Sequence, residues 1–216
     1  MSVKCRICGQ AAYLMEHEKL EKHYYHCVYC DYIFMDEKEI ISHEAEKHRY
    51  DQHKNTLDNR GYVNMFECFI EQAIIPYENQ IDTALDFGCG PGPVLAYLLK
   101  QRGIQVDVYD IYFQPKKVYE NKKYNLITST EVFEHLKYPM EQASTLLQRL
   151  TPNGILALMT SFHSNDVEQF SKWWYRKDDT HIGFFNAKTF EYIAKANNAK
   201  VIFNNDKNIC VLQKDR

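Results

Sequence analysis

A glycine-rich turn between an apolar strand and an apolar helix constrains this chain more than any other feature. Residues 84–92 have the sequence ALDFGCGPG, and residues 94–99 continue as VLAYLL. A strand, a glycine turn and a helix in this order place backbone N–H groups and the positive end of a helix beside a ligand. Glycine suits such a turn because it has no Cβ to block the ligand and because it accepts positive φ angles. The segment therefore predicts a ligand site at the end of a buried strand.

A carboxylate lies about twenty residues further along, where a nucleotide site of this type needs one. Residues 104–109, IQVDVY, indicate a second strand, and Asp110 follows directly. A carboxylate at such a strand end can accept hydrogen bonds from both hydroxyls of a ribose. The loop and the acid together predict a cofactor that carries a nucleoside. A tight turn without a ligand is the alternative interpretation of the loop.

The spacing of the glycines distinguishes between cofactors. Gly88, Gly90 and Gly92 form G-x-G-x-G, which differs from the G-x-G-x-x-G of nicotinamide sites. With Asp86 ahead of the first glycine, the loop resembles motif I of the class I S-adenosylmethionine-dependent methyltransferases. The resemblance implies that Asp86 orders the loop near the methionine amino group and that Asp110 holds the ribose. The cofactor-binding residues that we infer are Asp86, Gly88, Cys89, Gly90, Asp110, Ile111 and Glu131.

The resemblance covers about residues 60–214 and implies the fold of the family. The later segments that carry it are the strand 124–129 with TEVFEHL at 130–136, LTPNG at 150–154 before the strand 155–160, and a hairpin of 200–203 with 209–212. We therefore predict an α/β, Rossmann-like fold with a seven-stranded, mostly parallel sheet flanked by helices. The interval between Asp110 and Tyr124 is short, so the third strand and its helix are abbreviated. The adenine-contacting acid of the family has no match there.

Four cysteines near the N-terminus form the second motif. Cys5 and Cys8 make one C-x-x-C pair and Cys27 and Cys30 make another, with eighteen residues between the pairs. Each C-x-x-C turn directs two thiolates to one point, and two such turns complete the tetrahedron that zinc prefers. The spacing predicts a structural zinc site in a zinc-ribbon-like module. Reduced buried cysteines are the alternative, and a redox dithiol is disfavoured because this segment lacks a βαβ pattern.

Changes in sequence pattern divide the chain into three parts. These are a zinc-ribbon-like module over 1–35, a helical lid or linker over 36–78 and the methyltransferase domain over 79–216. The linker combines apolar residues at helical spacing with a polar connector that contains Tyr50, His53 and Asn55. Because such helices cover the cofactor cleft in related methyltransferases, these three residues are candidates for contact with the substrate. Ordinary polar loop residues are an equal alternative.

A cluster of acids and imidazoles follows the strand 124–129. On a helix, the spacing of Glu131, Glu134 and His135 puts all three on one face. Together with the later His181, they resemble the Mg²⁺ or Mn²⁺ site of metal-assisted O-methyltransferases, in which the ion acidifies a bound hydroxyl. Without a metal, His135 or His181 would be a general base near neutral pH. The predicted catalytic residues are His135, His181 and Glu134. The aromatic residues of the preceding insertion, which either line an acceptor pocket or pack a long loop, are Trp173, Trp174 and Tyr175.

Composition limits the range of functions. A formal net charge of −3 provides no general positive field for nucleic acid. The sequence has no apolar run of membrane-spanning length, and its first residues, MSVKC, do not resemble a signal peptide. Seven cysteines without an export signal favour metal binding or free thiols over disulfides. We therefore expect a cytoplasmic location without membrane contact.

These observations predict an enzyme that transfers a methyl group from S-adenosylmethionine to a small-molecule acceptor, at oxygen, nitrogen or carbon. Methylation of RNA, guided by the zinc ribbon, is the second interpretation. A non-catalytic adaptor that retains the methyltransferase fold is the third. The intact DFGCGPG loop at residues 86–92 argues against this last interpretation.

Overall fold

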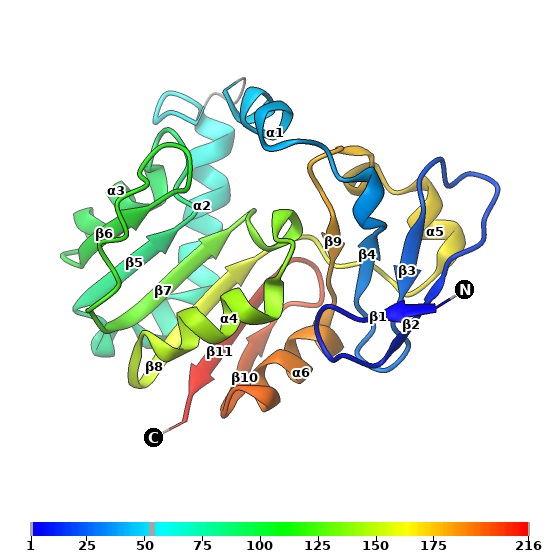
Figure 1. Cartoon of the computed structure of the whole chain (residues 1–216). Helices are drawn as coiled ribbons and strands as arrows, with labels where there is room; N and C mark the ends of the chain where they lie inside the picture. The colour runs from blue at the N-terminus through cyan, green and yellow to red at the C-terminus, as the bar shows by residue number, and fades with distance from the viewer. Residues whose placement is uncertain (1, 52–54, 216) are drawn as a thin grey trace.

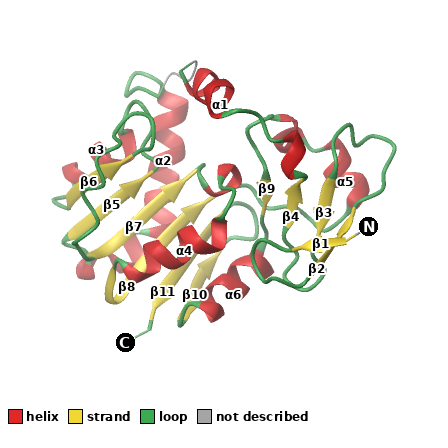
Figure 2. Cartoon of the chain, in the orientation of Figure 1, coloured by secondary structure: helices red, strands yellow, loops and turns green. Residues whose placement is uncertain are grey.

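Two β-sheets with helices around them make up the described part of the chain. The computed structural model describes residues 2–51 and 55–215 (Figures 1 and 2). One sheet has six strands and is formed by the chain after residue 80, whereas the other has five strands and is formed mainly by the N-terminal segment. The two sheets lie side by side, with the first strands in blue beside the orange strand β9 in Figure 1.

The six-stranded sheet has the order β10-β11-β8-β7-β5-β6. Strands β6, β5, β7 and β8 are parallel, whereas β11 and β10 continue the sheet as antiparallel strands. The bounds are β5 (Thr83–Phe87), β6 (Gln105–Tyr109), β7 (Tyr124–Thr130), β8 (Leu150–Met159), β10 (Ala199–Asn204) and β11 (Ile209–Lys214). The predicted C-terminal hairpin is therefore present, and the sheet is mixed.

Helices cover both faces of this sheet. The helices on one face are α2 (Arg60–Ala73) and α3 (Val94–Gln101), and those on the other are α4 (Pro139–Gln148) and α6 (Ala187–Ala196). Neighbouring strand residues point to opposite faces, so Leu126 packs with α2 and α3 whereas Ile127 packs with α4 and α6. Both side chains are fully buried, which explains the continuous apolar sequence of β7.

The predicted seventh strand is absent from the described residues. Between β6 and β7, residues 111–123 form turns and loop, with one isolated bridge between Asp110 and Gln114. This interval is too short for a strand and a crossover helix, because such a connection needs a dozen or more residues for the crossover alone. The sheet therefore ends at β6, and the seven-stranded prediction is wrong by one edge strand.

The five-stranded sheet combines distant parts of the chain. Its strands are β1 (Ser2–Lys4), β2 (Ala11–Leu14), β3 (Tyr24–His26), β4 (Ile33–Met35) and β9 (Gly183–Phe184), in that order and all antiparallel. Strand β9 follows two short helices, α5 (Val167–Lys172) and η4 (Trp174–Lys177). The segment expected to form a zinc-ribbon-like module thus shares its sheet with an insertion in the C-terminal part of the chain.

The segment between the sheets contains short helices. These are η1 (Glu37–Glu39), α1 (His43–Tyr50) and, after α2, η2 (Ile75–Gln80); a further turn, η3 (Phe133–His135), follows β7. The helix expected to begin at Asp36 begins at His43 instead, because the Ser42 hydroxyl accepts the N–H of Ala45 and caps it there. Within the described ranges, every helix is too short or too polar to cross a membrane.

The joint between β4 and β9 depends on a glycine. A Cβ built on Gly183 would lie 2.2 Å from the Tyr32 hydroxyl, and Tyr32 is fully buried. We expect Gly183→Ala to lower the free energy of unfolding by about 1–3 kcal/mol, because a packed core does not accept an added methyl group without strain. Urea denaturation would measure this change, with Gly61→Ala in α2 as the control, since its Cβ would meet only an ordinary contact at 3.5 Å.

The same contact offers a rescue experiment. The Tyr32 hydroxyl has no hydrogen-bond partner among the described residues, so Tyr32→Phe should cost nothing by itself. In the double variant, the phenyl ring leaves room for the Gly183→Ala methyl group, and most of the lost stability should return. A double variant as unstable as Gly183→Ala alone would contradict this account of the joint.

Candidate functional site

A cavity of about 680 Å³ lies at the carboxyl ends of the parallel strands. Its walls come from the glycine loop after β5, the turn after β6, the turn after β7, and the segments η1–α1 and α2. The residues before β9 close it on the side of the smaller sheet. This is the place where α/β sheets bind ligands, and the volume is typical of a small-molecule site.

The glycine loop forms one end of the cavity. Gly88 has φ +83°, and a Cβ on it would lie 2.2 Å from a methyl group of Val132, so only glycine fits there. The N–H groups of Gly88 and Cys89 donate to the carbonyl of Tyr109, at 2.8 and 3.1 Å. The loop is thereby fixed to the end of β6. Gly88 and Gly90 line the cavity, whereas Cys89 is buried outside its lining.

Asp110 joins the loop to the turn that follows β6. One carboxylate oxygen accepts the N–H of Gly90 at 3.0 Å, and the other accepts those of Tyr112 and Phe113 at 2.9 and 3.1 Å. Asp110 and Ile111 both line the cavity. The loop and the acid that the sequence predicted to act together are therefore in direct contact.

Asp86 lies below the loop and outside the lining of the cavity. Its side chain is 2% exposed, and it accepts a hydrogen bond from the Thr128 hydroxyl at 3.0 Å. Burial raises the pKa of this carboxyl to about 7, since the interior disfavours the charged form. The structure thus places Asp86 in the interior near the end of β5, beside β7.

Two histidines also line the cavity. Nδ1 of His135 lies 2.9 Å from the carbonyl of Thr180, and Nδ1 of His181 lies 2.7 Å from that of Tyr175. A carbonyl oxygen only accepts, so each Nδ1 carries the proton and each neutral ring has a bare Nε2. The ring centroids are 4.8 Å apart. Burial, followed by the neighbouring His135, lowers the pKa of His181, which favours the neutral form near pH 7.

Two carboxyl groups and a tyrosine lie beside this histidine pair. The Tyr175 hydroxyl donates to Glu134 at 2.5 Å and also lies 3.3 Å from Glu131. Glu134 is fully buried, whereas Glu131 lines the cavity at a residue with φ +54°. Desolvation within the cleft wall and the nearby charge of Glu134 raise the pKa of Glu131 to about 9.

Tyr175 is the residue of this cluster to which sequence reasoning gave no polar role. It was grouped with Trp173 and Trp174 as pocket wall or packing. Trp173 does pack against Phe170 and Phe184, whereas Trp174 is 71% exposed. The Tyr175 hydroxyl instead forms hydrogen bonds with both glutamates, although Tyr175 lies more than forty residues from them in the chain. No spacing rule connects residues that are so far apart.

Residues of helix α1 line the cavity. Glu46 accepts hydrogen bonds from the hydroxyls of Tyr50 and Tyr112, at 3.0 and 2.6 Å, and this links α1 to the turn after Asp110. Tyr50 also packs edge-on against His135, with centroids 5.3 Å apart. Of the three connector candidates, Tyr50 and Asn55 line the cavity, and His53 lies outside the described residues.

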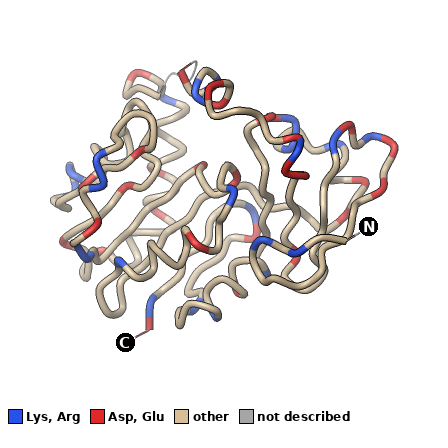
Figure 3. The backbone as a smooth tube through the Cα atoms, in the orientation of Figure 1, with Lys and Arg blue, Asp and Glu red and all other residues tan. Residues whose placement is uncertain are grey.

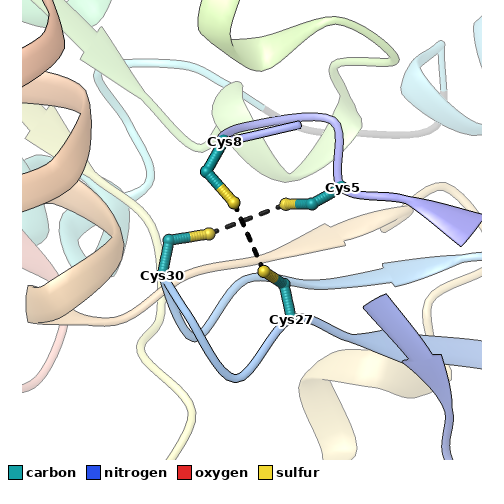
Figure 4. Close-up of side chains that lie close together, drawn as sticks. All are labelled: Cys5, Cys8, Cys27 and Cys30. Carbon is teal, nitrogen blue, oxygen red and sulfur yellow. Dashed lines mark hydrogen bonds between the residues drawn. The ribbon is translucent and has the colours of Figure 1, made fainter. Parts of the chain in front are cut away.

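The four cysteines of the N-terminal segment meet at one point (Figure 4). The sulfur atoms of Cys5 and Cys30 are 3.6 Å apart, and those of Cys8 and Cys27 are 3.3 Å apart. All four lie within 4.8 Å of one another. Thiolates at about 2.3 Å from a tetrahedral zinc ion would be about 3.8 Å apart, so the donor set fits such an ion.

Charged side chains are interspersed along the chain. Figure 3 shows Lys and Arg close to Asp and Glu in both the larger and the smaller sheet regions. Many of them pair, as Lys122 does with Asp107 and Lys188 with Asp31. The described residues therefore give no support to a phosphate-binding surface of the kind that RNA requires.

Comparison with known proteins identifies the class. Residues 70–203, more than half of the chain, match the family model described as a methyltransferase domain. The chain therefore belongs to the methyltransferase domain family. The methyltransferase family predicted from the glycine loop is thereby confirmed. No curated protein sequence matches the chain.

Solved structures share the fold at low sequence identity. An O-methyltransferase family protein from Burkholderia thailandensis is 11% identical with a TM-score of 0.56, over 79% of this chain and 63% of its own length. The plantazolicin methyltransferase BpumL, solved with a monoazolic desmethylPZN analogue and SAH, is 14% identical with a TM-score of 0.52, over 80% of this chain and 90% of its own. The chain thus spans less than two thirds of the first relative. At these identities, the likeness shows the fold.

The buried carboxyl of Asp86 predicts a pH dependence of stability. Its pKa in the folded chain is about 7, above the ordinary value of 3.8, so its ionisation opposes folding as the pH rises between these values. We expect Asp86→Asn, a neutral mimic, to gain about 2 kcal/mol relative to the native chain between pH 5 and pH 7.5. Urea unfolding at both pH values measures this gain. Parallel pH profiles of the two proteins would contradict the assignment.

Proposed function

We propose that this chain transfers a methyl group from S-adenosylmethionine to a small-molecule acceptor. The observation that carries the proposal is one cavity that is lined both by the glycine loop with Asp110 and by the imidazoles of His135 and His181. A cofactor end and an acceptor end in one enclosed space provide the proximity that a methyl transfer needs.

The cofactor end fits a cationic nucleoside. Gly88 and Gly90 leave their backbone open to a ligand, and Asp110 retains acceptor positions for ribose hydroxyls beyond its three backbone contacts. The acidic residues in the cavity lining are Glu37, Glu46, Asp110, Glu131 and Asp178. Lys137 is the cationic partner in that lining, and it pairs with Glu37. This excess of acids suits the positive sulfonium of S-adenosylmethionine.

The acceptor end can hold and remove a proton. In the neutral imidazoles of His135 and His181, Nε2 is an acceptor, so either ring can take a proton from a hydroxyl or amine. The carboxyl group of Glu131 lines the same cavity. S-adenosylmethionine supplies the methyl group, and the protein orients the acceptor and removes its proton. The family chemistry then leaves S-adenosylhomocysteine.

The shape of the cavity supports a small acceptor. Helix α1 covers the opening, and apolar side chains such as Ile40, Ile41 and Phe66 line the walls. Such a space encloses a molecule of modest size and excludes water. The similarity to BpumL and to an O-methyltransferase family protein is consistent with this acceptor class.

We also propose that the cysteine cluster binds structural zinc. The four sulfur atoms offer a complete tetrahedral set, and three of the four cysteines are buried. Such closed sites stabilise folds and leave no position for a substrate. The Cys30 carbonyl accepts the Thr189 hydroxyl of α6 at 2.9 Å, so a bound ion would also fix the smaller sheet to the larger one.

The ribose assignment predicts a loss of cofactor affinity. We expect Asp110→Ala to raise the Kd for S-adenosylmethionine at least about tenfold, because a charge-assisted hydrogen bond is worth about 1.5–3 kcal/mol. Calorimetry measures the affinity. Asp107→Ala is the matched control, since Asp107 lies on β6, the strand that Asp110 follows, and binds Lys122 and Tyr124 outside the cavity. Equal affinity of a folded Asp110→Ala variant and the native chain would overturn the assignment.

The cysteine cluster predicts the metal content. Chain prepared without chelators should contain one tightly held zinc ion at the four thiolates, and Cys8→Ser should lose it and unfold at lower temperature. Elemental analysis and thermal melting test this. Cys68→Ser is the control, because Cys68 is exposed on α2, remote from the cluster in sequence. Full zinc content in the Cys8→Ser variant would exclude the proposed ligand set.

A further inference from the structure

We propose that Glu134, His135 and His181 form a second metal site, which holds one divalent transition-metal ion at the acceptor end of the cavity. One ligand atom from each residue lies within 4.8 Å of the others. The site is distinct from the cysteine cluster in its residues and in its donor chemistry. Its place in the reaction, binding an oxygen of the acceptor, rests on the proposed function, whereas the binding of the ion does not.

The histidines are oriented as metal ligands are. Metal-binding imidazoles commonly donate their second N–H to a carbonyl or carboxylate, which fixes the ring and leaves the other nitrogen free. His135 and His181 both donate from Nδ1 to backbone carbonyls, at 2.9 and 2.7 Å. Both rings also line the cavity. The two neighbouring histidines share this hydrogen-bonding pattern, and each leaves Nε2 available as a metal ligand.

The glutamate supplies an independent observation. Glu134 is fully buried; one carboxylate oxygen accepts the Tyr175 hydroxyl, and the other, Oε2, has no hydrogen-bond partner among the described residues. An unpaired carboxylate oxygen in the interior is costly, because it loses its hydration without compensation. A cation between this oxygen and the two imidazoles would compensate the loss. Glu134 Oε1 and His135 Nε2 are already only 3.9 Å apart.

The donor set indicates the kind of ion. Two imidazoles and one carboxylate suit zinc, iron, cobalt or nickel, whereas magnesium prefers oxygen ligands and waters. This differs from the Mg²⁺ or Mn²⁺ site implied by the sequence resemblance. It also omits Glu131, which is not part of the three-residue group. Three protein ligands leave coordination positions open, as in catalytic sites.

The fold holds these ligands in place before any ion binds. Ile182, next to His181, donates its N–H to the carbonyl of Glu134 at 2.8 Å, and its own carbonyl accepts the N–H of Met35 at 3.0 Å. The turn that carries Glu134 and His135 is therefore tied to the segment that carries His181, and both are tied to β4. Such rigid support is what a metal site of defined geometry requires.

Metal stoichiometry of the full chain tests the proposal. Chain dialysed against Zn²⁺, and in parallel against Co²⁺, should bind two ions, and the Co²⁺ spectrum should contain one thiolate-ligated and one thiolate-free component. Glu134→Gln and His181→Ala should each weaken the thiolate-free ion at least about tenfold and leave the thiolate ion in place. Cys8→Ser should weaken the thiolate ion and leave the thiolate-free ion in place. His23→Ala, which removes an exposed histidine, is the control and should retain both ions.

Two results would overturn the proposal: a native chain that binds only the thiolate ion, or a thiolate-free ion that persists in both variants. Glu134→Gln preserves shape, and circular dichroism shows whether each variant is folded. Calorimetry with S-adenosylmethionine on the same proteins separates this question from the proposed function. A chain that binds two ions but no S-adenosylmethionine would refute the methyltransferase proposal and leave the metal site standing.

Discussion

The pairing of β4 with β9 is the interaction on which the arrangement of the molecule depends. It joins two residues of each strand, Ile33 with Phe184 and Phe34 with Gly183, and it connects the two sheets. The hydrogen bond from Met35 to Ile182 extends the ladder by one residue towards His181. The wall of the cavity next to the histidines is therefore supported by the N-terminal segment. The smaller sheet thus connects the cysteine cluster to the wall of the cavity that lies next to the histidines.

Buried carboxyl groups set the electrostatics of the site. Asp86 lies under the glycine loop and Glu134 lies behind the histidines, each with a hydroxyl group as its donor, from Thr128 and Tyr175 respectively. Neutral donors compensate a buried charge only partly, so a nearby cation would stabilise such groups. A positively charged cofactor at one end and a metal ion at the other would both meet this requirement. The acidity of the cavity is thus consistent with what each end is proposed to bind.

Local sequence patterns predicted the parts of the structure that are local. The glycine loop, Asp110, the four cysteines and the C-terminal hairpin each depend on residues close in the chain or on a fixed spacing, and the structure brings them together as expected. The prediction of a seventh strand was wrong because it followed the family pattern, whereas residues 111–123 have room only for turns. Strand β9 was missed because two residues, Gly183 and Phe184, carry no strand signal of their own.

The candidate site also combines local features that the sequence predicted with long-range contacts that it did not predict. The motif around Glu131, Glu134 and His135 was visible in the sequence, but its geometry was not, since these residues leave β7 through a turn with a positive φ at Glu131 rather than along a regular helix. The hydroxyl of Tyr175 and the carbonyls of Thr180 and Tyr175 decide how the acids and imidazoles are oriented. These contacts are made across the fold, and only the packed structure reveals them.

The order of the strands has a consequence for how the chain is made. The first four strands of the small sheet leave the ribosome early, and the cysteine pairs lie among them, whereas β9 is synthesised near the end. Until then, the outer edge of β4 has no neighbour, and all three of its residues are apolar. An unpaired apolar edge readily pairs with other chains. The edge of β4 in the nascent chain must therefore avoid pairing with other chains until β9 has emerged.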